Sequence, residues 1–429
     1  MFNFRSIARF AILTPIIVIL LTIGWYQQAI EHSNIPETTL PIDEPSGSQP
    51  TESFVIAGYF INWGIYDRKY HVVDIQAKKL SHVLYAFANV NTDGTILLGT
   101  IDGKLDPWKE NDQDLHGNFK QLNLLKQQNR HLKVSLSIGG YSWSGNFSNV
   151  AASPKSRATF TKTAISHLQN LGLDGIDIDW EFPKDSNDAE NYVLLLKELR
   201  NALDEYQQKI DPTEEPFLLS VAMPCGPENY RILKLADMAK YVDLFYLMAY
   251  DFAGEWDQQT GHQSNLFGGS LNVNQAIDDY EKAGVPSKKL VMGMPAYGRG
   301  FSNTSPKPGS SYQGVPDGSW DRGSYDYKNL PQEGAEEYLD ETNIASWSYN
   351  KHTKEFVTYD TPDVVRAKSE YIKKRHLGGG MFWELTADVP GDDPRSLVHT
   401  VYQVLGNQLD RSPNHIAFPL SHYNNIPHA

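Results

Sequence analysis

The chain has 429 residues, a net charge of −14 and a single cysteine, and these quantities already exclude several classes of protein. The hydrophobic fraction of 40% supplies a sizeable core and is too high for a disordered protein. The excess of Asp and Glu (52) over Lys and Arg (38) disfavours nucleic acid as a partner, because phosphate backbones bind basic surfaces. Cys225 alone can form neither an intrachain disulfide nor a thiolate metal cluster, and we expect it to be a packed thiol.

The first predicted element is an apolar segment at the N-terminus. Arg5 and Arg9 precede an uncharged run, 10–26, which as a helix would reach about 26 Å. Residues 1–26 are therefore either a signal anchor, with the arginines on the cytoplasmic side, or a cleaved signal peptide. Both alternatives place the rest of the chain at the cell surface or outside the cell. Residues 27–53 are rich in Pro, Ser and Thr and predict a linker.

From residue 54 onward, short apolar runs alternate with longer helical patterns. The strand-like runs are 55–63, 82–90, 132–139, 175–181, 217–223, 242–250, 290–297 and 378–383, and the amphipathic stretches include 156–171, 189–206, 272–283 and 362–375. Eight such runs at helical spacing predict an α/β fold, a (β/α)8 TIM barrel, over residues 54–300 and 359–406. A doubly wound parallel sheet is the structural alternative.

One long segment interrupts this alternation. Residues 301–358, between the seventh and eighth runs, are rich in Gly, Pro, Ser, Tyr and Trp and are too long for a structureless loop. We expect a small α+β insertion domain here. Loops that follow barrel strands surround the active site, so this domain would form one wall of it. Residues 407–429 are polar and are expected to be a tail.

The most informative segment is 173–181, with the sequence Leu-Asp-Gly-Ile-Asp-Ile-Asp-Trp-Glu. Side chains alternate along a strand, so Asp177, Asp179 and Glu181 share one face at a spacing of about 6.6 Å. Both faces of a barrel strand are buried, and crowded carboxylates cannot all ionise, so at least one pKa must rise. A raised carboxyl pKa suits a general acid. A solvated acidic face and a Mg²⁺ or Ca²⁺ site are the other interpretations.

Five motifs in order resemble those of glycoside hydrolase family 18, the chitinases and their relatives. The acidic segment matches the family signature D-x-x-D-x-D-x-E from Asp174 to Glu181. The other four are Ser137-Ile138-Gly139-Gly140, Met248-Ala249-Tyr250-Asp251, Ala296-Tyr297-Gly298-Arg299 and Gly380-Met381-Phe382-Trp383-Glu384. The resemblance covers about residues 55–406, and the segment 301–358 is similar to the family's chitinase insertion domain.

The resemblance implies a catalytic set on the acidic face. Glu181 would be the general acid, and the nucleophile would be the substrate's own acetamido oxygen rather than a second carboxylate. Asp179 would orient the acetamido group as it closes to an oxazolinium ion, and Asp177 would share a proton with Asp179. Tyr250 would hydrogen-bond the acetamido carbonyl. Asp174 is expected to support the strand end.

The implied substrate-binding residues come from the motifs and from aromatic residues near strand ends. They are Tyr59, Phe87, Gly140, Tyr141, Met248, Asp251, Trp256, Tyr297, Arg299 and Trp383. Trp383 would form the floor under the −1 sugar, because a ring face stacks on the apolar face of a pyranose. Tyr141 stands where many members of the family carry Trp. The resemblance also implies non-proline cis peptide bonds at Ala86–Phe87 and Trp383–Glu384.

The function that the resemblance implies is hydrolysis of β-1,4-linked N-acetylglucosamine in chitin, with retention. The expected partner is chitin or a chito-oligosaccharide, with no cofactor, no metal and no nucleic acid, in a monomer that contacts a membrane only through residues 10–26. An endo-β-N-acetylglucosaminidase acting on N-glycans and a non-catalytic chitin-binding lectin are the alternatives. Outside the cell, Asn146-Phe147-Ser148 and Asn303-Thr304-Ser305 are N-glycosylation sequons.

Overall fold

The computed structural model describes residues 52–98 and 113–427. The expected anchor or signal peptide at 1–26, and all of the linker except its last two residues, lie outside the described residues. No helix in the described part of the chain is long and apolar enough to cross a membrane.

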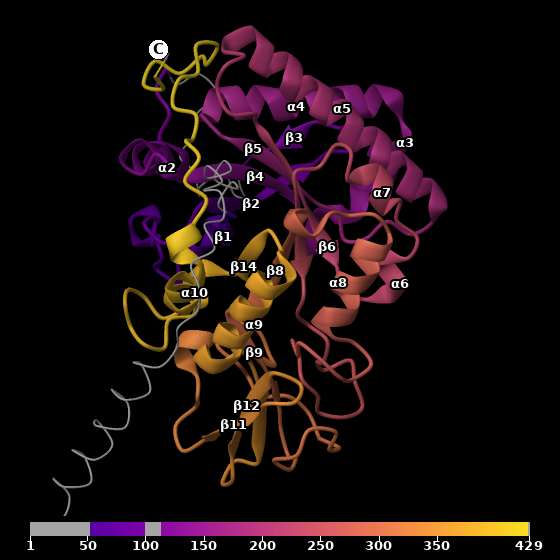
Figure 1. Ribbon diagram of the computed structural model, residues 1–429, viewed down its shortest axis with the longest axis vertical. Coiled ribbons are helices and arrows are strands. Elements are labelled where there is room, and N and C mark those ends of the chain that lie inside the picture. Colours follow the sequence, from indigo (N-terminus) through magenta and orange to yellow (C-terminus); the bar gives the residue numbers. More distant parts are fainter. Residues whose placement is uncertain (1–51, 99–112, 428–429) are drawn as a thin grey trace, which may run out of the picture. The chain divides into compact units, whose positions relative to one another are not determined.

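Eight parallel strands close into a barrel, as predicted (Figure 1). They are β1 (Val55–Ile61), β2 (His82–Val90), β4 (Lys133–Gly139), β5 (Gly175–Asp179), β6 (Leu218–Pro224), β7 (Leu244–Met248), β8 (Leu290–Pro295) and β14 (Gly379–Trp383). Each pairs with the next barrel strand, and β1 pairs with both β2 and β14, which closes the cylinder. The short β3 (Ile96–Leu97) adds antiparallel to β2. The predicted (β/α)8 architecture is confirmed.

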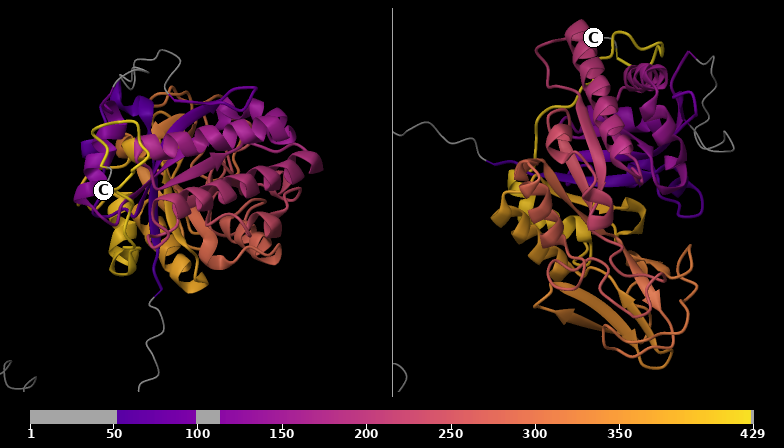
Figure 2. Two further views of the ribbon diagram at one scale, coloured as in Figure 1. Left: turned by 90° about the horizontal axis from the view of Figure 1, so that it is seen from above. Right: turned by 90° about the vertical axis from the view of Figure 1, so that its right-hand side faces the viewer.

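Helices surround the barrel (Figure 2). They are α2 (Gly117–Gln128), α3 (Phe147–Ala152), α4 (Pro154–Leu171), α5 (Ser186–Ile210), α6 (Pro227–Tyr230), α7 (Leu235–Met238), α8 (Val273–Lys282), α9 (Pro362–Arg375) and α10 (Leu397–Leu405). Local sequence sets their ends. The side chain of Ser153 caps the start of α4, and Gly172 ends it with φ 67°. Asp185 caps the start of α5 in the same way.

Short 3-10 turns lie at several strand and helix ends. They are η1 (Asn62–Ile65), η2 (Val72–Asp74), η3 (Tyr141–Asn146), η4 (Ser287–Lys289), η5 (Tyr327–Asn329), η6 (Leu385–Ala387) and η7 (Gly406–Gln408). The predicted non-proline cis peptide bonds at Ala86–Phe87 and Trp383–Glu384 are present, and a third joins Glu181 to Phe182.

The side chains of β5 and of Trp180 just after it alternate between the two sides of the barrel wall. Ile176, Ile178 and Trp180 pack in the large core between the strands and the helices. The barrel interior holds a smaller apolar cluster that includes Tyr59 and Tyr246. The acidic residues of β5 alternate with the isoleucines and point into the barrel, so the predicted alternation of faces is confirmed.

A second sheet is inserted between β8 and β14. Its five antiparallel strands, in the order β10-β9-β13-β12-β11, are β9 (Tyr297–Phe301), β10 (Ser324–Asp326), β11 (Glu336–Asp340), β12 (Ala345–Asn350) and β13 (Glu355–Thr358). The sheet packs on its own small core around Phe301, Tyr349 and Phe356. It is an insertion domain at the expected place, with helical structure in its described residues limited to η5.

The C-terminal segment, expected to be a polar tail, packs on the barrel instead. Phe418, Tyr423 and Ile426 are almost fully buried. The backbone N–H of His415 donates to Asp174 Oδ1 at 2.8 Å. The other oxygen of Asp174 accepts the backbone N–H of Val134 and pairs with Lys126, both at 2.7 Å. Asp174 therefore supports the start of β5, as expected.

Candidate active site

Asp177 is completely buried inside the barrel and accepts hydrogen bonds from three hydroxyl groups. Tyr59 and Ser137 donate to Oδ2 at 3.1 and 2.7 Å, and Ser220 donates to Oδ1 at 2.7 Å. Ser137 on β4 and Ser220 on β6 lie directly opposite Asp177 in the strand register. Burial raises the pKa of Asp177, and the three hydrogen bonds offset part of this rise because they favour the charged form.

Asp179, the next inward-facing residue of β5, is less well supplied with donors. Its Oδ1 is buried and has no hydrogen-bond partner among the described residues. Burial raises its pKa well above the ordinary range, and the charges of Glu181 and Asp177 raise it further. An unpaired buried carboxyl oxygen is open to a donor from a bound ligand.

Glu181 follows β5 by two residues and is partly exposed. Burial raises its pKa to about 7, assisted by the negative charge of Asp251, while a hydrogen bond from the backbone N–H of Tyr141 opposes this rise. The backbone N–H of Glu181 donates to Ser144 Oγ at 2.7 Å. A fixed carboxyl with a pKa near 7 is suited to general acid and base catalysis.

The end of β7 brings a second group of predicted residues to the same place. Asp251 has a left-handed φ of 60°. Its Oδ1 accepts Tyr297 Oη at 2.7 Å and Arg299 Nε and Nη2 at 2.9 and 2.8 Å. The guanidinium of Arg299 also lies over the ring of Trp256, 5.2 Å from its centroid. Burial, and then the charge of Asp179, raises the pKa of Tyr250, so its phenol stays protonated and can donate.

Aromatic rings from β2 and β14 lie at the barrel mouth, and the buried ring of Tyr59 on β1 packs against them. The Trp383 centroid lies 5.2 Å from that of Tyr59 and 5.7 Å from that of Phe87, with a nearly parallel stack on Phe87. Trp63 stacks on Phe87 in turn. Gly140 has φ 83°, and a Cβ at this position would lie 2.8 Å from the Phe87 ring, so only glycine fits here.

The predicted site residues thus gather at the carboxyl ends of the barrel strands, but not all present their side chains to solvent. Tyr59 is 1% exposed, and its hydroxyl is bonded to Asp177, so it supports the acidic residues rather than offering a ring face. Tyr141 is 83% exposed and Trp256 is 57% exposed. Met248 is half-buried at the end of β7.

Three serines with polar roles in the site were not predicted. Ser137 and Ser220 bind Asp177, and Ser144 donates to the carbonyls of Gly140 and Asp179. The sequence pattern that could have identified two of them is the alternation of side chains along a strand, because Ser137 and Ser220 occupy inward-facing positions of otherwise apolar strands. A polar residue at such a position needs a partner inside the barrel.

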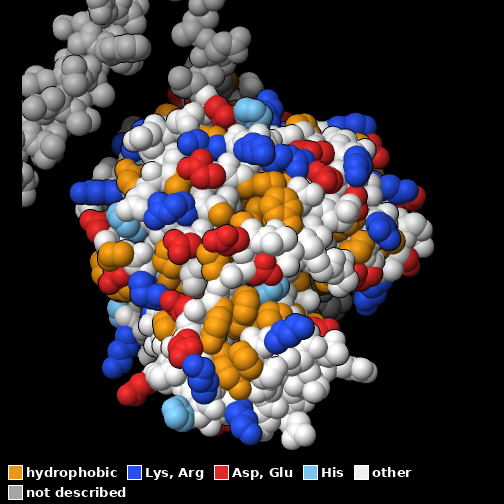
Figure 3. Space-filling view, turned by 60° about the horizontal axis from the view of Figure 1, so that its bottom comes forward, with side chains coloured by type: hydrophobic (Ala, Val, Ile, Leu, Met, Phe, Trp, Pro, Cys, Tyr) orange, Lys and Arg blue, Asp and Glu red, His pale blue; other side chains and the backbone are white. Residues whose placement is uncertain are grey.

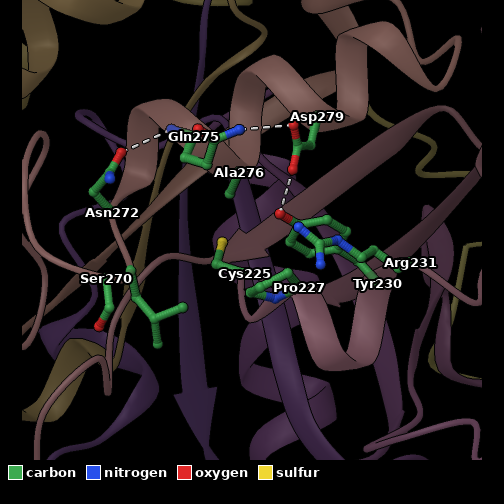
Figure 4. A pocket seen from close by; sticks show the side chains of 10 residues that line it. Cys225, Pro227, Tyr230, Arg231, Ser270, Asn272, Gln275, Ala276 and Asp279 are labelled. Atoms are coloured by element: carbon green, nitrogen blue, oxygen red, sulfur yellow. Dashed lines mark hydrogen bonds between the residues drawn. The ribbon is translucent and has the colours of Figure 1, made fainter.

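A separate cavity of about 290 Å³ lies between the end of β6 and the start of α8 (Figure 4). Its polar side chains bind one another, since Tyr230 and Gln275 both donate to Asp279 at 2.7 Å. Cys225, which also lines it, is buried, and burial raises the pKa of the thiol. The expected packed thiol is confirmed. Within residues 52–98 and 113–427, no group of three or more His, Cys, Asp and Glu could hold a metal ion.

Comparisons with known proteins identify the family of the chain. The model of the glycosyl hydrolases family 18 matches residues 55–388. The chain is 43% identical over 400 residues to "Chitinase 1" of Aphanocladium album, covering 90% of this chain and 93% of that protein. It is 42% identical to "Endochitinase 1" of Metarhizium robertsii, covering 87% and 90% of the two chains.

Among solved structures, the Group IV chitinase of Ostrinia furnacalis in complex with allosamidin is similar, with a TM-score of 0.74 and 30% identity. The match covers 83% of this chain and all of that one. The chain belongs to glycoside hydrolase family 18, and the resemblance carried by the five motifs is confirmed. It is a glycoside hydrolase.

Proposed function

We propose that the protein hydrolyses β-1,4 linkages between N-acetylglucosamine units of chitin, with retention of the anomeric configuration. The observation that carries this proposal is the acidic group of buried Asp177 and Asp179 with the partly exposed Glu181, near the phenol of Tyr250. The names of the two relatives, a chitinase and an endochitinase, support the same substrate.

Glu181 supplies the proton to the leaving glycosidic oxygen. With a pKa of about 7, Glu181 holds a proton in mildly acidic solution and loses it readily. Both properties are needed because the same group serves first as the acid and then as the base. Burial and the charges of Glu181 and Asp177 raise the pKa of the neighbouring Asp179, which favours the neutral carboxyl and makes it a weaker nucleophile. The acetamido oxygen of the −1 sugar therefore attacks the anomeric carbon, and water later opens the oxazolinium ion.

Asp179 and Tyr250 hold the acetamido group for this attack. The unpaired Oδ1 of Asp179 accepts the acetamido N–H once its carboxyl is ionised, and the phenol of Tyr250 donates to the acetamido oxygen. Asp177 has donors on both oxygens, whereas Oδ1 of Asp179 has none, so a proton shared by the pair rests mainly on Asp179 in the free enzyme.

Aromatic residues bind the sugar rings. Trp383 and Phe87 form the floor of the −1 subsite, and the exposed Tyr141 and Trp256 extend the binding surface, because ring faces stack on the apolar faces of pyranoses. Exposed hydrophobic side chains gather in patches among mixed charges on the face shown in Figure 3. Met248, Arg299, Tyr297 and Asp251 line the edge of the site.

A product time course on chito-oligosaccharides of defined length tests this function. We expect shorter N-acetylglucosamine oligomers whose new reducing ends form first as the β anomer. The initial product lengths also separate endo from exo action. Release of N-glycans with chitin left intact would instead support an endo-β-N-acetylglucosaminidase. Binding to chitin without any products would support a lectin.

We also propose that the barrel lies outside the cytoplasm, as a monomer carried there by residues 1–26. The basic start and the apolar run 10–26 support this placement. Mass analysis of the mature N-terminus separates the two routes, because a start near Trp25 means a cleaved signal peptide. Recovery of intact full-length chain from the cytosol would contradict the proposal. Light scattering of the purified protein tests the monomer.

A further inference from the structure

Gln263 lies in the long segment between β7 and α8 and is completely buried. Its side-chain Nε2 donates to the backbone carbonyls of Tyr297 and Thr358 at 2.7 and 3.2 Å. Its backbone N–H donates to Thr358 Oγ1 at 3.2 Å, and its backbone carbonyl accepts the N–H of Phe252 at 2.9 Å. One residue therefore joins the segment after β7 to β9 and β13 of the inserted sheet.

These hydrogen bonds close a ring around Asp251. Phe252, held by the Gln263 carbonyl, directly follows Asp251 in the chain. Tyr297, whose carbonyl accepts the Gln263 amide, donates its hydroxyl to the Asp251 carboxylate at 2.7 Å. Gln263 thus connects the backbone of Asp251 to the residue that holds its side chain. A left-handed φ of 60° at a non-glycine residue persists where the surroundings hold it.

Asp251 acts on Glu181 through its charge. After burial, this charge is the largest cause that raises the pKa of Glu181 to about 7. Asp179 and Tyr250 also interact electrostatically with Glu181, and the Arg299 guanidinium pairs with Asp251. Because a Coulomb interaction weakens with distance, a displacement of Asp251 changes the proton affinity of the acid.

We propose that Gln263 is a positioning residue, which holds Asp251 at a fixed place relative to Glu181 by joining Phe252 to Tyr297. This inference rests on the role proposed above for Glu181. An amide NH₂ has two hydrogens, and Gln263 uses one for each carbonyl it faces. Its Oε1 is buried without a partner among the described residues, so the side chain acts through these two donated bonds.

The neighbouring Ser264 provides a matched control. Its hydroxyl donates to Asp360 Oδ1 at 2.7 Å, and Asp360 forms a buried ion pair with Lys368. Ser264 therefore attaches the same segment of chain to Asp360, two residues after the end of β13. Its side chain forms no hydrogen bond with the residues of the ring around Asp251. Loss of its hydroxyl loosens the segment but leaves the ring around Asp251 closed.

The test compares Gln263→Met, which keeps length and volume but removes both donors, with Ser264→Ala. Unfolding temperature and the pH dependence of kcat/KM on a chito-oligosaccharide are measured for each. We expect both variants to unfold at lower temperature. Only Gln263→Met should move the alkaline limb of kcat/KM to lower pH, by about half a unit or more, with a lower kcat. A limb that stays in place, or an equal shift in both variants, overturns the inference.

Two further variants keep the test decisive. Thr358→Val removes the hydroxyl that accepts the backbone N–H of Gln263 and keeps the backbone carbonyl that accepts its side chain. It loosens the attachment of Gln263 to β13 and should give a smaller shift in the same direction, measurable even if Gln263→Met does not fold; an unmoved limb contradicts the inference. Glu181→Gln is assayed in parallel. If it keeps more than a tenth of the wild-type rate, the proposed acid is wrong. If it is inactive while the Gln263 and Thr358 variants leave the limb unmoved, only the positioning role is wrong.

Discussion

Ser220 lies directly opposite Asp177 in the register of β6 and β5, and its hydroxyl donates to Oδ1 of that carboxylate over 2.7 Å. Ser137 holds the corresponding position on β4 and donates to the other oxygen at the same distance. The deepest carboxyl of the site is thus held from both sides by neighbouring strands. Burial favours its neutral form, whereas the hydroxyls favour its charged form.

Ser220→Ala should raise the pKa of Asp177 further and lower turnover, because the carboxylate loses a donor that stabilises its charge. Loss of a hydrogen bond to a charged group typically costs about 1.5–3 kcal/mol of unfolding free energy. We expect little change in KM, since Asp177 is buried beneath Asp179. Steady-state kinetics and urea denaturation measure these effects.

The control for this variant is Ser81→Ala, which removes a buried hydroxyl that accepts the Ile56 backbone N–H at 3.0 Å, just before β2 begins. This variant should lose stability but keep its turnover. Equal losses of turnover in both variants would show that the Ser220 effect is only a consequence of lower stability.

Glu181 should set the alkaline limit of activity. Because its pKa is raised to about 7, kcat/KM should fall above about pH 7 as the acid loses its proton. Asp251→Asn removes the negative charge that assists this rise, so the limb should move to lower pH. Glu181→Gln should reduce turnover by about 10²-fold or more while oligosaccharide binding, followed by tryptophan fluorescence, persists. A fully active Glu181→Gln protein is incompatible with the assignment.

The sequence predicts the parts of this site that depend on local pattern. Strand alternation predicts that Asp177, Asp179 and Glu181 share one face, and this prediction needs no knowledge of neighbouring strands; β5 contains the first two, and Glu181 follows its end. Ser137 and Ser220 act through the register between strands, which no short motif specifies. For the same reason Gln263 could not be recognised from sequence, because its bonds reach two segments that are distant along the chain.

The C-terminal segment shows a second limit of sequence-based prediction. Phe418, Tyr423 and Ile426 are isolated apolar residues in a polar stretch without helical or strand periodicity. The segment is attached by hydrogen bonds, since the Asn414 amide donates to backbone carbonyls of Lys126, Asn129 and Leu132, between the last turn of α2 and the start of β4. Hydrophobic periodicity in the sequence predicts helices and strands, so it cannot predict the burial of a segment that packs without regular secondary structure.

Glu384, next to the aromatic floor, should make stability depend on pH. Its oxygens accept the hydroxyl and the backbone N–H of Thr386, both at 2.7 Å, and Arg68 lies 3.5 Å away. Burial raises its pKa from 4.5 to about 7. Between these values the folded protein keeps a proton that the unfolded chain releases, so the contribution of Glu384 to stability falls as pH rises.

The size of this effect follows from a rise of roughly 2.5 pKa units, which corresponds to about 3 kcal/mol at this buried site. Glu384→Gln does not titrate. The difference in unfolding free energy between wild type and variant should therefore change by this amount between about pH 4.5 and pH 7.5. Urea denaturation at several pH values measures it, with the exposed Glu341→Gln as the control. Parallel stability curves for wild type and Glu384→Gln would contradict the expected titration.

The source of the nucleophile can be tested on the substrate rather than on the enzyme. Burial raises the pKa of Asp179, two residues before Glu181, and so favours its neutral form, while Tyr250 has a protonated phenol that can donate. If the acetamido oxygen attacks, hydrolysis requires an N-acetyl group on the −1 sugar, whatever occupies the other subsites. A glucosamine at −1 offers no such oxygen, and it forfeits an effective molarity of up to about 10⁵ M or more.

Partially acetylated chitosan should therefore yield products whose new reducing ends are all N-acetylglucosamine. Mass-spectrometric sequencing of end-labelled products measures this directly. The new non-reducing ends serve as the internal control, because the sugar there supplies no nucleophile and glucosamine is accepted according to binding alone. A stable thiazoline analogue of the oxazolinium ion should also inhibit more tightly than substrate binds. Frequent glucosamine at new reducing ends would show that the acetamido oxygen is not the nucleophile. The roles proposed for Asp179 and Tyr250 would then be wrong, and a covalent mechanism with an enzyme carboxylate as nucleophile would replace them.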